Sequence, residues 1–310
     1  MAQDAAAATV AVLGYGHQGE AHALNLRDSG RSVIVGARPG GEAESRARRA
    51  RFAVAPLPDA AAAADVVACL LPDDAFPAVF DAELRRSLRP RATLVFAHGF
   101  NLLYRPPALR PEWDAVLVSP TGPGDAVRAS YGRGGIPCYL AVHQDGSGHA
   151  WERAEAYAVA LGSARMLRTT IREETEVDLF GEQAVLCGGM NALVMTAFDT
   201  LVRAGYAPEM AYLECVNQLA YLARALQERG VAGLRRSISA TALFGDLTRG
   251  PRVLGEEGGR RFAAILDEVR DGTFAREWMA ESARGAPLLR EGLERSAGEA
   301  IEEAYRKLSR

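Results

Sequence analysis

The sequence predicts an α/β fold, with a Rossmann-type parallel sheet in the first half of the chain and a mostly helical second half. Up to residue 168, short apolar runs alternate with helical patterns. That alternation is typical of a parallel sheet covered by helices on both faces. A glycine-rich turn follows the first apolar run. Beyond residue 168 there is no convincing strand, and the apolar spacing becomes that of helices.

The chain opens with a predicted βαβ unit. The apolar run at residues 9–13 ends at the glycine turn, a helix is expected at 20–28, and the second strand is expected at 32–36. Further strands are expected at residues 64–71, 92–97, 115–118 and 136–142.

Two domains are expected from the length of 310 residues and from the change of pattern. We assign residues 1–170 to a dinucleotide-binding domain and residues 171–310 to a helical domain. Within the second, helical periodicity bounded by Gly and Pro covers 182–205 and 208–228.

The composition limits the partners. A net charge of −3 provides no basic field, so neither nucleic acid nor an anionic membrane is an expected partner. Residues 1–8 do not have the pattern of a signal peptide, and no apolar run looks long enough to span a bilayer. We therefore expect a cytoplasmic enzyme with a small-molecule substrate. The cysteines lack CxxC spacing and are interpreted as small buried hydrophobic residues: Cys69, Cys138, Cys187 and Cys215.

The glycine turn has the spacing of a dinucleotide-binding motif. Its first glycine permits a tight turn, its second lets the backbone approach a pyrophosphate, and its third allows close packing of helix on strand. The helix that follows offers N–H groups and a partial positive charge to the phosphates. Because a strand precedes the motif and a helix and strand follow it, we favour nicotinamide binding here. The candidate residues are Gly14, Tyr15, Gly16, His17, Gln18 and Gly19.

The segment after the second strand bears on the choice of nicotinamide. Arg38 could face a 2′-phosphate or stack on adenine, and Glu42 or Glu44 could accept from the ribose hydroxyls. Both glutamates could equally begin a helix, where acids suit the dipole. The basic run at 46–51 is interpreted as a solvated helix face.

Carboxylates in the second half suggest a metal site. Asp178 and Glu182 are four residues apart, so on a helix they share one face. Like charges at that spacing repel unless a cation such as Mg²⁺ neutralises them. Glu214 is a lone carboxylate on an otherwise apolar helix, 212–226, which we interpret as a buried core or dimer helix.

At this point the chain resembles the ketol-acid reductoisomerase family in its short form. The resemblance covers nearly all of the chain. It rests on Gly-Tyr-Gly-His-Gln-Gly at 14–19, Leu-Leu-Pro-Asp at 70–73, Ala-His-Gly-Phe-Asn at 97–101, Gly-Pro-Gly at 122–124, Ala-Val-His-Gln-Asp at 141–145, Asp-Leu-Phe-Gly-Glu-Gln-Ala-Val-Leu-Cys-Gly-Gly at 178–189, Ser-Ile-Ser at 237–239 and Gly-Pro-Arg-Val at 250–253.

The resemblance implies NADPH-dependent conversion of an acetohydroxy acid to a dihydroxy acid, with an alkyl shift on two Mg²⁺ ions. Asp178 would bridge both metals, Glu182 would bind the first and Glu214 the second. Ser239 would contact the substrate carboxylate, and His98 would lie beside the nicotinamide. Pro72, Asp73 and Gly124 lie in matched motifs and join the candidate cofactor-binding residues. The family also implies a knotted helical domain and a homodimer or higher oligomer, with Glu214 and Ser239 reaching the partner's site.

The departures from the family pattern fall in the site. Gln218 stands where a second glutamate is expected one turn after Glu214, and Thr121 stands where a lysine is expected. An amide lacks the negative charge, so the second metal should bind more weakly. The serines that usually hold the 2′-phosphate align with Gly41 and Ala43, and Glu42 between them would repel a phosphate, which favours NADH.

These departures predict a reductase acting on a C=O or C=N substrate, with weakened or lost isomerisation. The alkyl shift relies on metal cations, whereas hydride transfer relies mainly on the positioned cofactor. Two alternatives remain: an authentic ketol-acid reductoisomerase of branched-chain amino-acid synthesis, and a protein that binds the dinucleotide without catalysis.

Overall fold

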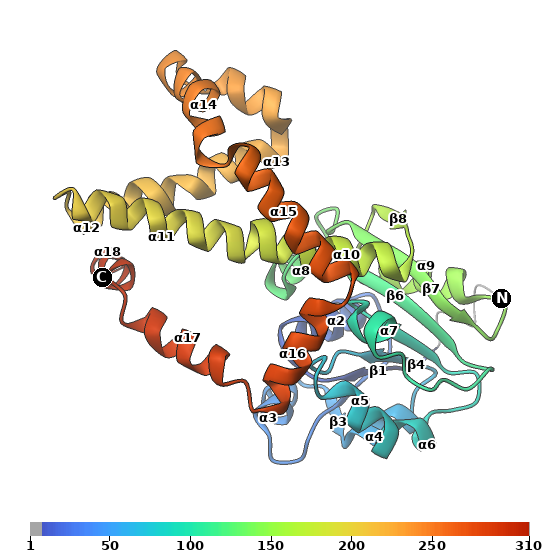
Figure 1. Cartoon of the computed structure of the whole chain (residues 1–310). Coiled ribbons are helices and arrows are strands. Elements are labelled where there is room, and N and C mark those ends of the chain that lie inside the picture. The colour runs from blue at the N-terminus through green and yellow to red at the C-terminus, as the bar shows by residue number, and fades with distance from the viewer. Residues whose placement is uncertain (1–7, 310) are drawn as a thin grey trace. The chain divides into compact units, whose positions relative to one another are not determined.

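The computed structural model describes residues 8–309. The chain divides into two compact units, one ending at Val177 and the other beginning at Asp178. The first unit is α/β and the second is helical (Figure 1). The expectation about a signal peptide concerns residues 1–8, nearly all of which lie outside the described residues.

The first unit contains an eight-stranded sheet with the order β3-β2-β1-β4-β5-β6-β7-β8. Every neighbouring pair is parallel except β6 and β7, which are antiparallel. The strands are β1 (Val10–Leu13), β2 (Val33–Gly36), β3 (Ala53–Ala55), β4 (Val66–Cys69), β5 (Thr93–Phe96), β6 (Asp114–Pro120), β7 (Cys138–Asp145) and β8 (Met166–Arg168). The predicted α/β class is confirmed.

Two details of the sheet differ from the prediction. Strands β3 and β8 have three residues each, too few to show a period, and the sequence pattern missed them. Strand β7 runs antiparallel to β6, although a parallel sheet was expected. The connecting helix α8 (Gly124–Ser130) packs on α2, and the glycines at 132, 134 and 135 then adopt positive φ, so the chain reverses instead of crossing over.

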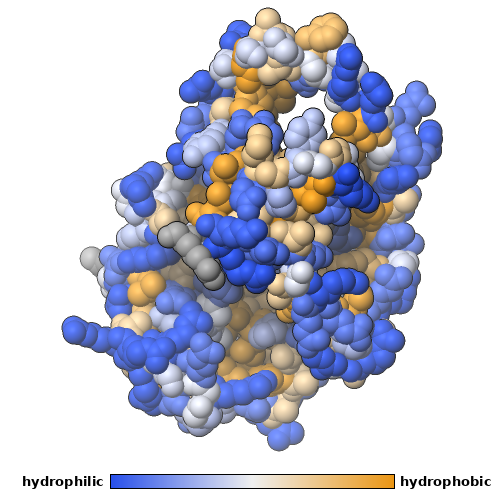
Figure 2. Space-filling model, turned by 90° about the vertical axis from the view of Figure 1, so that its left-hand side faces the viewer, coloured by the Kyte–Doolittle hydropathy of each residue, from blue (hydrophilic) through white to orange (hydrophobic). Residues whose placement is uncertain are grey.

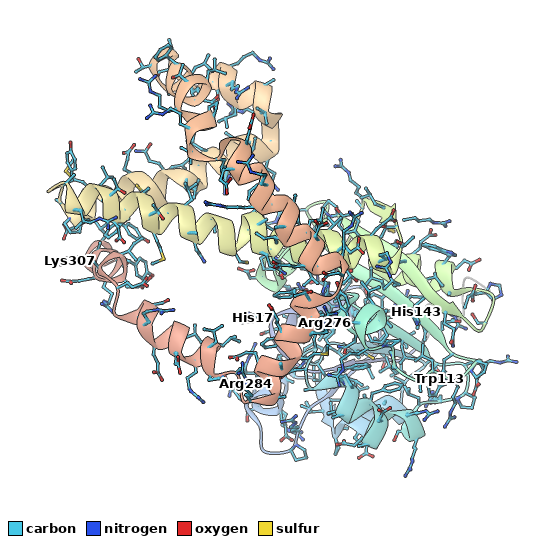
Figure 3. All side chains as sticks on the ribbon, viewed as in Figure 1. His17, Trp113, His143, Arg276, Arg284 and Lys307 are labelled. Carbon is cyan, nitrogen blue, oxygen red and sulfur yellow. The ribbon has the colours of Figure 1, made fainter. Side chains whose placement is uncertain are left out.

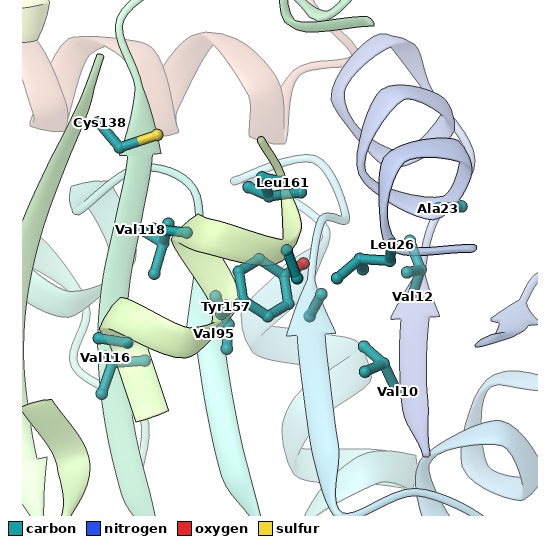
Figure 4. Close-up of a cluster of buried hydrophobic side chains, with 14 of the residues drawn as sticks. Val10, Val12, Ala23, Leu26, Val95, Val116, Val118, Cys138, Tyr157 and Leu161 are labelled. Atoms are coloured by element: carbon teal, nitrogen blue, oxygen red, sulfur yellow. The ribbon is translucent and has the colours of Figure 1, made fainter. Parts of the chain in front are cut away.

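Two apolar layers bury the sheet. Along β1, Val10 and Val12 belong to one cluster, whereas Ala11 and Leu13 belong to the other. Since successive side chains of a strand point to opposite faces, a strand buried on both faces is apolar throughout. Figure 4 shows the first cluster, where Tyr157 packs among valines and leucines.

The helices of the first unit cover the two faces of this sheet. They are α2 (His17–Asp28), α3 (Glu42–Arg49), α4 (Leu57–Ala62), α5 (Phe76–Val79), the π-helical turn η1 (Phe80–Leu84), α6 (Arg85–Ser87), α7 (Phe100–Tyr104), α8 and α9 (Ala150–Ala160). Helix α2 begins at His17, three residues before the predicted start, directly after Gly16 of the glycine turn.

Helix α10 (Ile171–Gly181) leads into the second unit, whose described elements are all helical. They are η2 (Glu182–Leu186), α11 (Gly188–Arg203), α12 (Pro208–Tyr212), η3 (Leu213–Asn217), α13 (Gln218–Ser237), α14 (Ala240–Val253), α15 (Gly255–Arg270), α16 (Thr273–Ala283), α17 (Pro287–Ala297) and α18 (Ala300–Leu308). Helix α18 packs on α12, and Lys307, labelled in Figure 3, forms a 3.1 Å ion pair with Glu209. The absence of strands beyond residue 168 is confirmed for the described residues.

Apolar side chains remain exposed on the second unit. Helix α13 has no buried residue among those described, and its Tyr221, Leu222 and Leu226 are exposed. Apolar residues also reach the surface on the face shown in Figure 2. The helix at 212–226 is therefore not a core helix of the single chain. Cys187 is likewise exposed and Cys215 half-buried, so the expectation of burial is correct for Cys69 and Cys138 alone.

One helical run, Ile171–Arg203, is long and apolar enough to cross a membrane by length and composition, and 6% of its apolar window is buried. The sequence analysis expected no such run. The difference arises because α10, η2 and α11 join end to end, whereas the sequence pattern treated them as separate segments. A single run of this kind is weak evidence for a membrane.

Candidate active site

A cavity of about 500 Å³ opens at the carboxyl ends of β1, β2 and β4 in the first unit. This is where the strand order reverses, since β1 has β2 on one side and β4 on the other. Open α/β sheets bind ligands at such a switch point. The cavity is lined by Gly14, Tyr15, Gly16, His17, Gln18, Gly19, Gly36, Ala37, Arg38, Gly41, Glu42, Ala43, Leu57, Leu70, Leu71, Pro72, Ala75 and Val79.

The three motif glycines have different structural roles. Gly14 has a φ of +95°, and a Cβ there would lie 2.5 Å from the carbonyl oxygen of Leu70. A Cβ on Gly19 would lie 2.2 Å from the carbonyl oxygen of Gly14, so the start of α2 packs directly on the turn. A Cβ on Gly16 would meet nothing within 4 Å among the described residues. Gly16 therefore leaves open the space at the start of α2 where a phosphate group is expected.

A second turn, at residues 122–124, packs on the glycine turn. The side-chain amide of Gln18 donates to the carbonyl of Gly122 at 2.9 Å, and a Cβ on Gly124 would lie 2.1 Å from the carbonyl oxygen of His17. The hydroxyl of Tyr15 and Oε1 of Gln18 are buried with no hydrogen-bond partner among the described residues. Buried polar atoms of this kind are normally satisfied. Since both residues line the cavity, they fit a polar ligand such as a dinucleotide.

The loop between β2 and α3 completes the cavity. Arg38 and Glu42 line it, and Glu42 is the first residue of α3. Glu44 turns back onto the loop, where one carboxylate oxygen accepts from the amide of Gly40 at 2.6 Å. The other oxygen accepts from Nε and Nη2 of Arg48 at 3.0 and 2.8 Å. Of the two glutamates proposed as ribose acceptors, Glu42 therefore lies on the cavity and Glu44 is engaged within its own loop.

His98 follows β5, at the same edge of the sheet. Its Nδ1 lies 3.4 Å from a carboxylate oxygen of Glu174, and the other oxygen of Glu174 accepts from the amide of Gly99 at 3.1 Å. Glu174 is 2% exposed. A Cβ on Gly99 would lie 2.1 Å from Oγ1 of Thr175, so glycine permits the close approach of α10. Sequence reasoning missed Glu174, although its spacing to Asp178 repeats that of Asp178 to Glu182.

Asp178 lies one turn after Glu174 on the continuous helix α10. One ligand atom each of His98, Glu174 and Asp178 lie within 4.8 Å of one another. A ring nitrogen and carboxylate oxygens are donors that bind divalent cations.

The side chain of Asn101 donates to the backbone carbonyl and to the carboxylate of Asp73, at 3.0 and 3.1 Å. Asp73 directly follows Pro72, which lines the cavity, and Gly124 packs against the cavity-lining His17.

The other candidate residues lie in the helical unit. Glu182 and Glu214 are exposed, and each lies in a π-helical turn, η2 and η3 respectively. Such turns are frequent at functional sites. The side-chain amide of Gln218 donates to Glu214 at 2.6 Å. Ser239 is the N-cap of α14, where its hydroxyl accepts from the amide of Ala242 at 3.2 Å.

Thr121 lies in the first unit, where the resemblance expects a lysine. Its backbone amide and its hydroxyl both donate to the carbonyl of Pro137, at 2.9 and 3.0 Å. The threonine side chain is thus used to hold the end of β6 to the start of β7, and it supplies no cation.

The sheet order, the glycine turn and the cavity at the switch point define an NAD(P)H-dependent oxidoreductase with a Rossmann-type domain. Residues 5–166 match the domain described as acetohydroxy acid isomeroreductase, NADPH-binding domain. Residues 171–310 match the ketol-acid reductoisomerase C-terminal domain. The chain belongs to the ketol-acid reductoisomerase family.

Solved structures agree with this assignment. An NADH-preferring ketol-acid reductoisomerase from an uncultured archaeon is 36% identical, with a TM-score of 0.94, over 97% of this chain and 94% of that chain. A semialdehyde dehydrogenase NAD-binding protein from Cupriavidus necator, in complex with calcium and NAD, is 19% identical, with a TM-score of 0.62 over 85% and 99% of the two chains. The second likeness is one of fold alone.

Proposed function

We propose that this enzyme transfers hydride from NADH to a C=O or C=N substrate, and that its alkyl-shift activity is weakened or lost. The observation that carries the proposal is the 2.6 Å hydrogen bond from the Gln218 amide to Glu214. A glutamate in place of Gln218 would need a cation to share with Glu214, whereas the amide satisfies the carboxylate directly. Thr121 supports the same conclusion, because its hydroxyl is bonded to Pro137.

The groups that serve hydride transfer are retained. The cavity offers the glycine turn to a pyrophosphate, and Tyr15 and Gln18 have buried polar atoms available to the dinucleotide. A bound nicotinamide supplies the hydride itself. We assign His98 to the nicotinamide side of the site, where Glu174 holds its Nδ1. Pro72, Asp73 and Gly124 are assigned to cofactor binding from the same edge of the sheet.

The preference for NADH is assigned to Glu42. Glu42 lines the cavity, as Arg38 does, and it is the first residue of α3; the positions on either side are Gly41 and Ala43, which have no hydroxyl to donate to a phosphate. A carboxylate accepts hydrogen bonds from ribose hydroxyls and repels a 2′-phosphate. The solved relative at 36% identity is described as NADH-preferring.

A Mg²⁺ ion would be held by Asp178 and Glu182, whose oxygen donors suit a hard cation. Glu214 is the remaining candidate ligand for a second ion, and its bond with Gln218 competes with metal binding. When bound, Mg²⁺ would polarise the substrate oxygen. Ser239 is proposed to contact the substrate.

We further propose a cytoplasmic homodimer or higher oligomer with shared active sites. The exposed apolar residues of α13 are the support, because a surface rich in such residues is typical of an interface. Sedimentation of the protein over a range of concentrations tests this. A monomer at every concentration would contradict it.

Restoring both missing groups tests the proposed loss of isomerisation. The double variant Gln218→Glu, Thr121→Lys should increase Mg²⁺-dependent conversion of acetolactate to a dihydroxy acid by at least about tenfold, which corresponds to about 1.4 kcal/mol in the barrier. Gln227→Glu is the matched control, since it makes the same Gln to Glu exchange at an exposed position of α13 away from Glu214. Rapid conversion of acetolactate by the unchanged protein would contradict the proposal.

A second candidate is an authentic ketol-acid reductoisomerase that tolerates Gln218 and Thr121. The TM-score of 0.94 to a solved ketol-acid reductoisomerase favours it. Dihydroxy-acid formation by the unchanged protein with Mg²⁺ and either nicotinamide would support this candidate.

Binding of the dinucleotide without catalysis is the third outcome, and single-turnover oxidation of bound NADH by 2-keto acids tests it.

A further inference from the structure

In the loop after β2 and the helix that follows, donors of the kind that bind anions contact a carboxylate of the protein itself, that of Glu44. One carboxylate oxygen of Glu44 accepts from the backbone amide of Gly40 at 2.6 Å. The other accepts two bonds from the guanidinium of Arg48, at 3.0 and 2.8 Å. A backbone N–H and a guanidinium fork that converge on one oxyanion are the donors that commonly bind a phosphate group.

This internal ion pair belongs to the segment that borders the cofactor cavity, although Gly40, Glu44 and Arg48 are not themselves among the lining residues. Gly40 stands between Arg38 and Gly41, which both line it. Because a single carboxylate bridges Gly40 and Arg48, the guanidinium is held alongside the loop. The Glu44 side chain is 21% exposed and the Arg48 side chain 58% exposed, so the carboxylate is the better shielded partner of a surface pair.

A second arginine of α3 is neutralised in a similar way. Arg46 forms an ion pair with Glu20 of α2, and its guanidinium lies 5.6 Å from the ring centre of Tyr15. Two of the arginines in the basic run 46–51 thus have carboxylate partners, and the run is solvated as expected, since Arg48, Arg49 and Arg51 are exposed. Arg38 is the arginine that lines the cavity.

We propose that Glu44 is a specificity-determining residue, because its carboxylate occupies donors that could otherwise bind the 2′-phosphate of NADPH. Glu44 accepts hydrogen bonds from the Gly40 amide and the Arg48 guanidinium, so that neither donor is available to the phosphate of NADPH. This inference rests on the proposed NADH preference and extends it. Glu42 repels a phosphate at the cavity, whereas Glu44 removes the donors that would bind one.

Equilibrium binding of NADH and NADPH, measured by quenching of tryptophan fluorescence, tests the inference. In Glu44→Gln, the amide oxygen can still accept from Gly40, so the loop is kept while Arg48 loses its partner. We expect Glu44→Gln to bind NADPH at least about tenfold more tightly than the parent, with NADH affinity changed by less than about threefold. Adding Arg48→Met should abolish the gain.

The matched control is Glu155→Gln, which removes one acid from an exposed ion pair with Arg168 in the same unit and should leave both affinities unchanged. If the ratio of NADPH affinity to NADH affinity in Glu44→Gln equals that of the parent, the inference is overturned. A gain that persists in the double variant with Arg48→Met would also overturn it, because simple loss of repulsion would then explain the gain. The proposed NADH preference is tested separately, by the ratio of NADPH affinity to NADH affinity in the parent and in Glu42→Gln. The NADH preference and the role of Glu44 can therefore fail independently.

Discussion

The carboxylate of Glu174 lies 3.4 Å from Nδ1 of His98, and it also accepts from the amide of Gly99 at 3.1 Å. This contact orients the imidazole ring and favours one tautomer. An acceptor beside Nδ1 favours a proton on Nδ1 and leaves Nε2 as the acceptor. Glu174 is thus placed to orient His98 from a buried position on α10.

Glu174→Gln should therefore disturb the protonation of His98 more than its position. The glutamine oxygen can still accept from Gly99, but the negative charge beside the imidazole is lost. We expect single-turnover hydride transfer to fall by about 10-fold to 100-fold, with NADH affinity almost unchanged. Nitrogen-15 chemical shifts of the His98 ring should show a mixture of tautomers. The control is Glu173→Gln. The Glu173 carboxylate accepts hydrogen bonds from the hydroxyls of Thr169 and Thr170, whereas the carboxylate beside the imidazole is that of Glu174. Equal losses in both variants would contradict the positioning role.

The glycine motif makes a paired prediction. Gly19→Ala places a Cβ 2.2 Å from the Gly14 carbonyl and should destabilise the protein by about 1–3 kcal/mol. Gly16→Ala meets no described atom within 4 Å, so its stability should change by less than about 1 kcal/mol. Its methyl group enters the cavity, and we expect NADH affinity to fall at least about tenfold. Thermal unfolding and fluorescence titration of both variants check this. Tight NADH binding by Gly16→Ala would show that the pyrophosphate lies elsewhere.

Buried His22 predicts acid sensitivity of the first unit. Its Nδ1 lies 3.0 Å from the hydroxyl of Tyr157, and desolvation lowers the pKa of His22 to about 3. In the unfolded chain the pKa is about 6.5, so below that pH the unfolded state binds a proton that the folded state refuses. The free energy of unfolding should therefore fall as the pH drops from about 6.5 towards 3, by up to about 1.4 kcal/mol per pH unit.

Urea unfolding at several pH values measures this slope. His22→Leu should flatten the slope between pH 6 and 4, whereas Tyr157→Phe should keep it, because His22 remains buried. An identical slope in the parent and in His22→Leu would assign the acid sensitivity to other groups.

The buried carboxylate of Asp114 predicts a large cost for losing its partner. Asp114 is fully buried at the start of β6 and accepts from Arg153 at 2.7 Å and from the hydroxyl of Ser147 at 2.8 Å. Arg153→Met leaves this charge without its counterion and should cost about 3 kcal/mol. Arg260→Met breaks the exposed pair with Glu257 and should cost less than about 1 kcal/mol. Equal unfolding midpoints for the two variants would contradict the difference.

Residue patterns along the chain were enough to predict the α/β class, six of the eight strands, the glycine turn and the family. These features are local, because a buried strand must be apolar along its length and a tight turn must place glycine where φ is positive. Gly14 and Gly19 could be assigned their roles from spacing alone. The departures at Gln218 and Thr121 were also visible without a structure.

Which polar groups contact one another could not be predicted in this way and is known from the three-dimensional structure. Glu174 and His98 are 76 residues apart, and although Glu174 shares the four-residue spacing of Asp178 and Glu182, that spacing does not show that His98 lies against it. Glu42 and Glu44 look equivalent in sequence, yet the backbone turn at Gly40 directs Glu44 onto its own loop and leaves Glu42 at the cavity. The direction of β7 was decided in the same way. The physical reason is common to all three: hydrogen bonds and strand pairing depend on distances across the fold, which residue spacing along the chain does not fix.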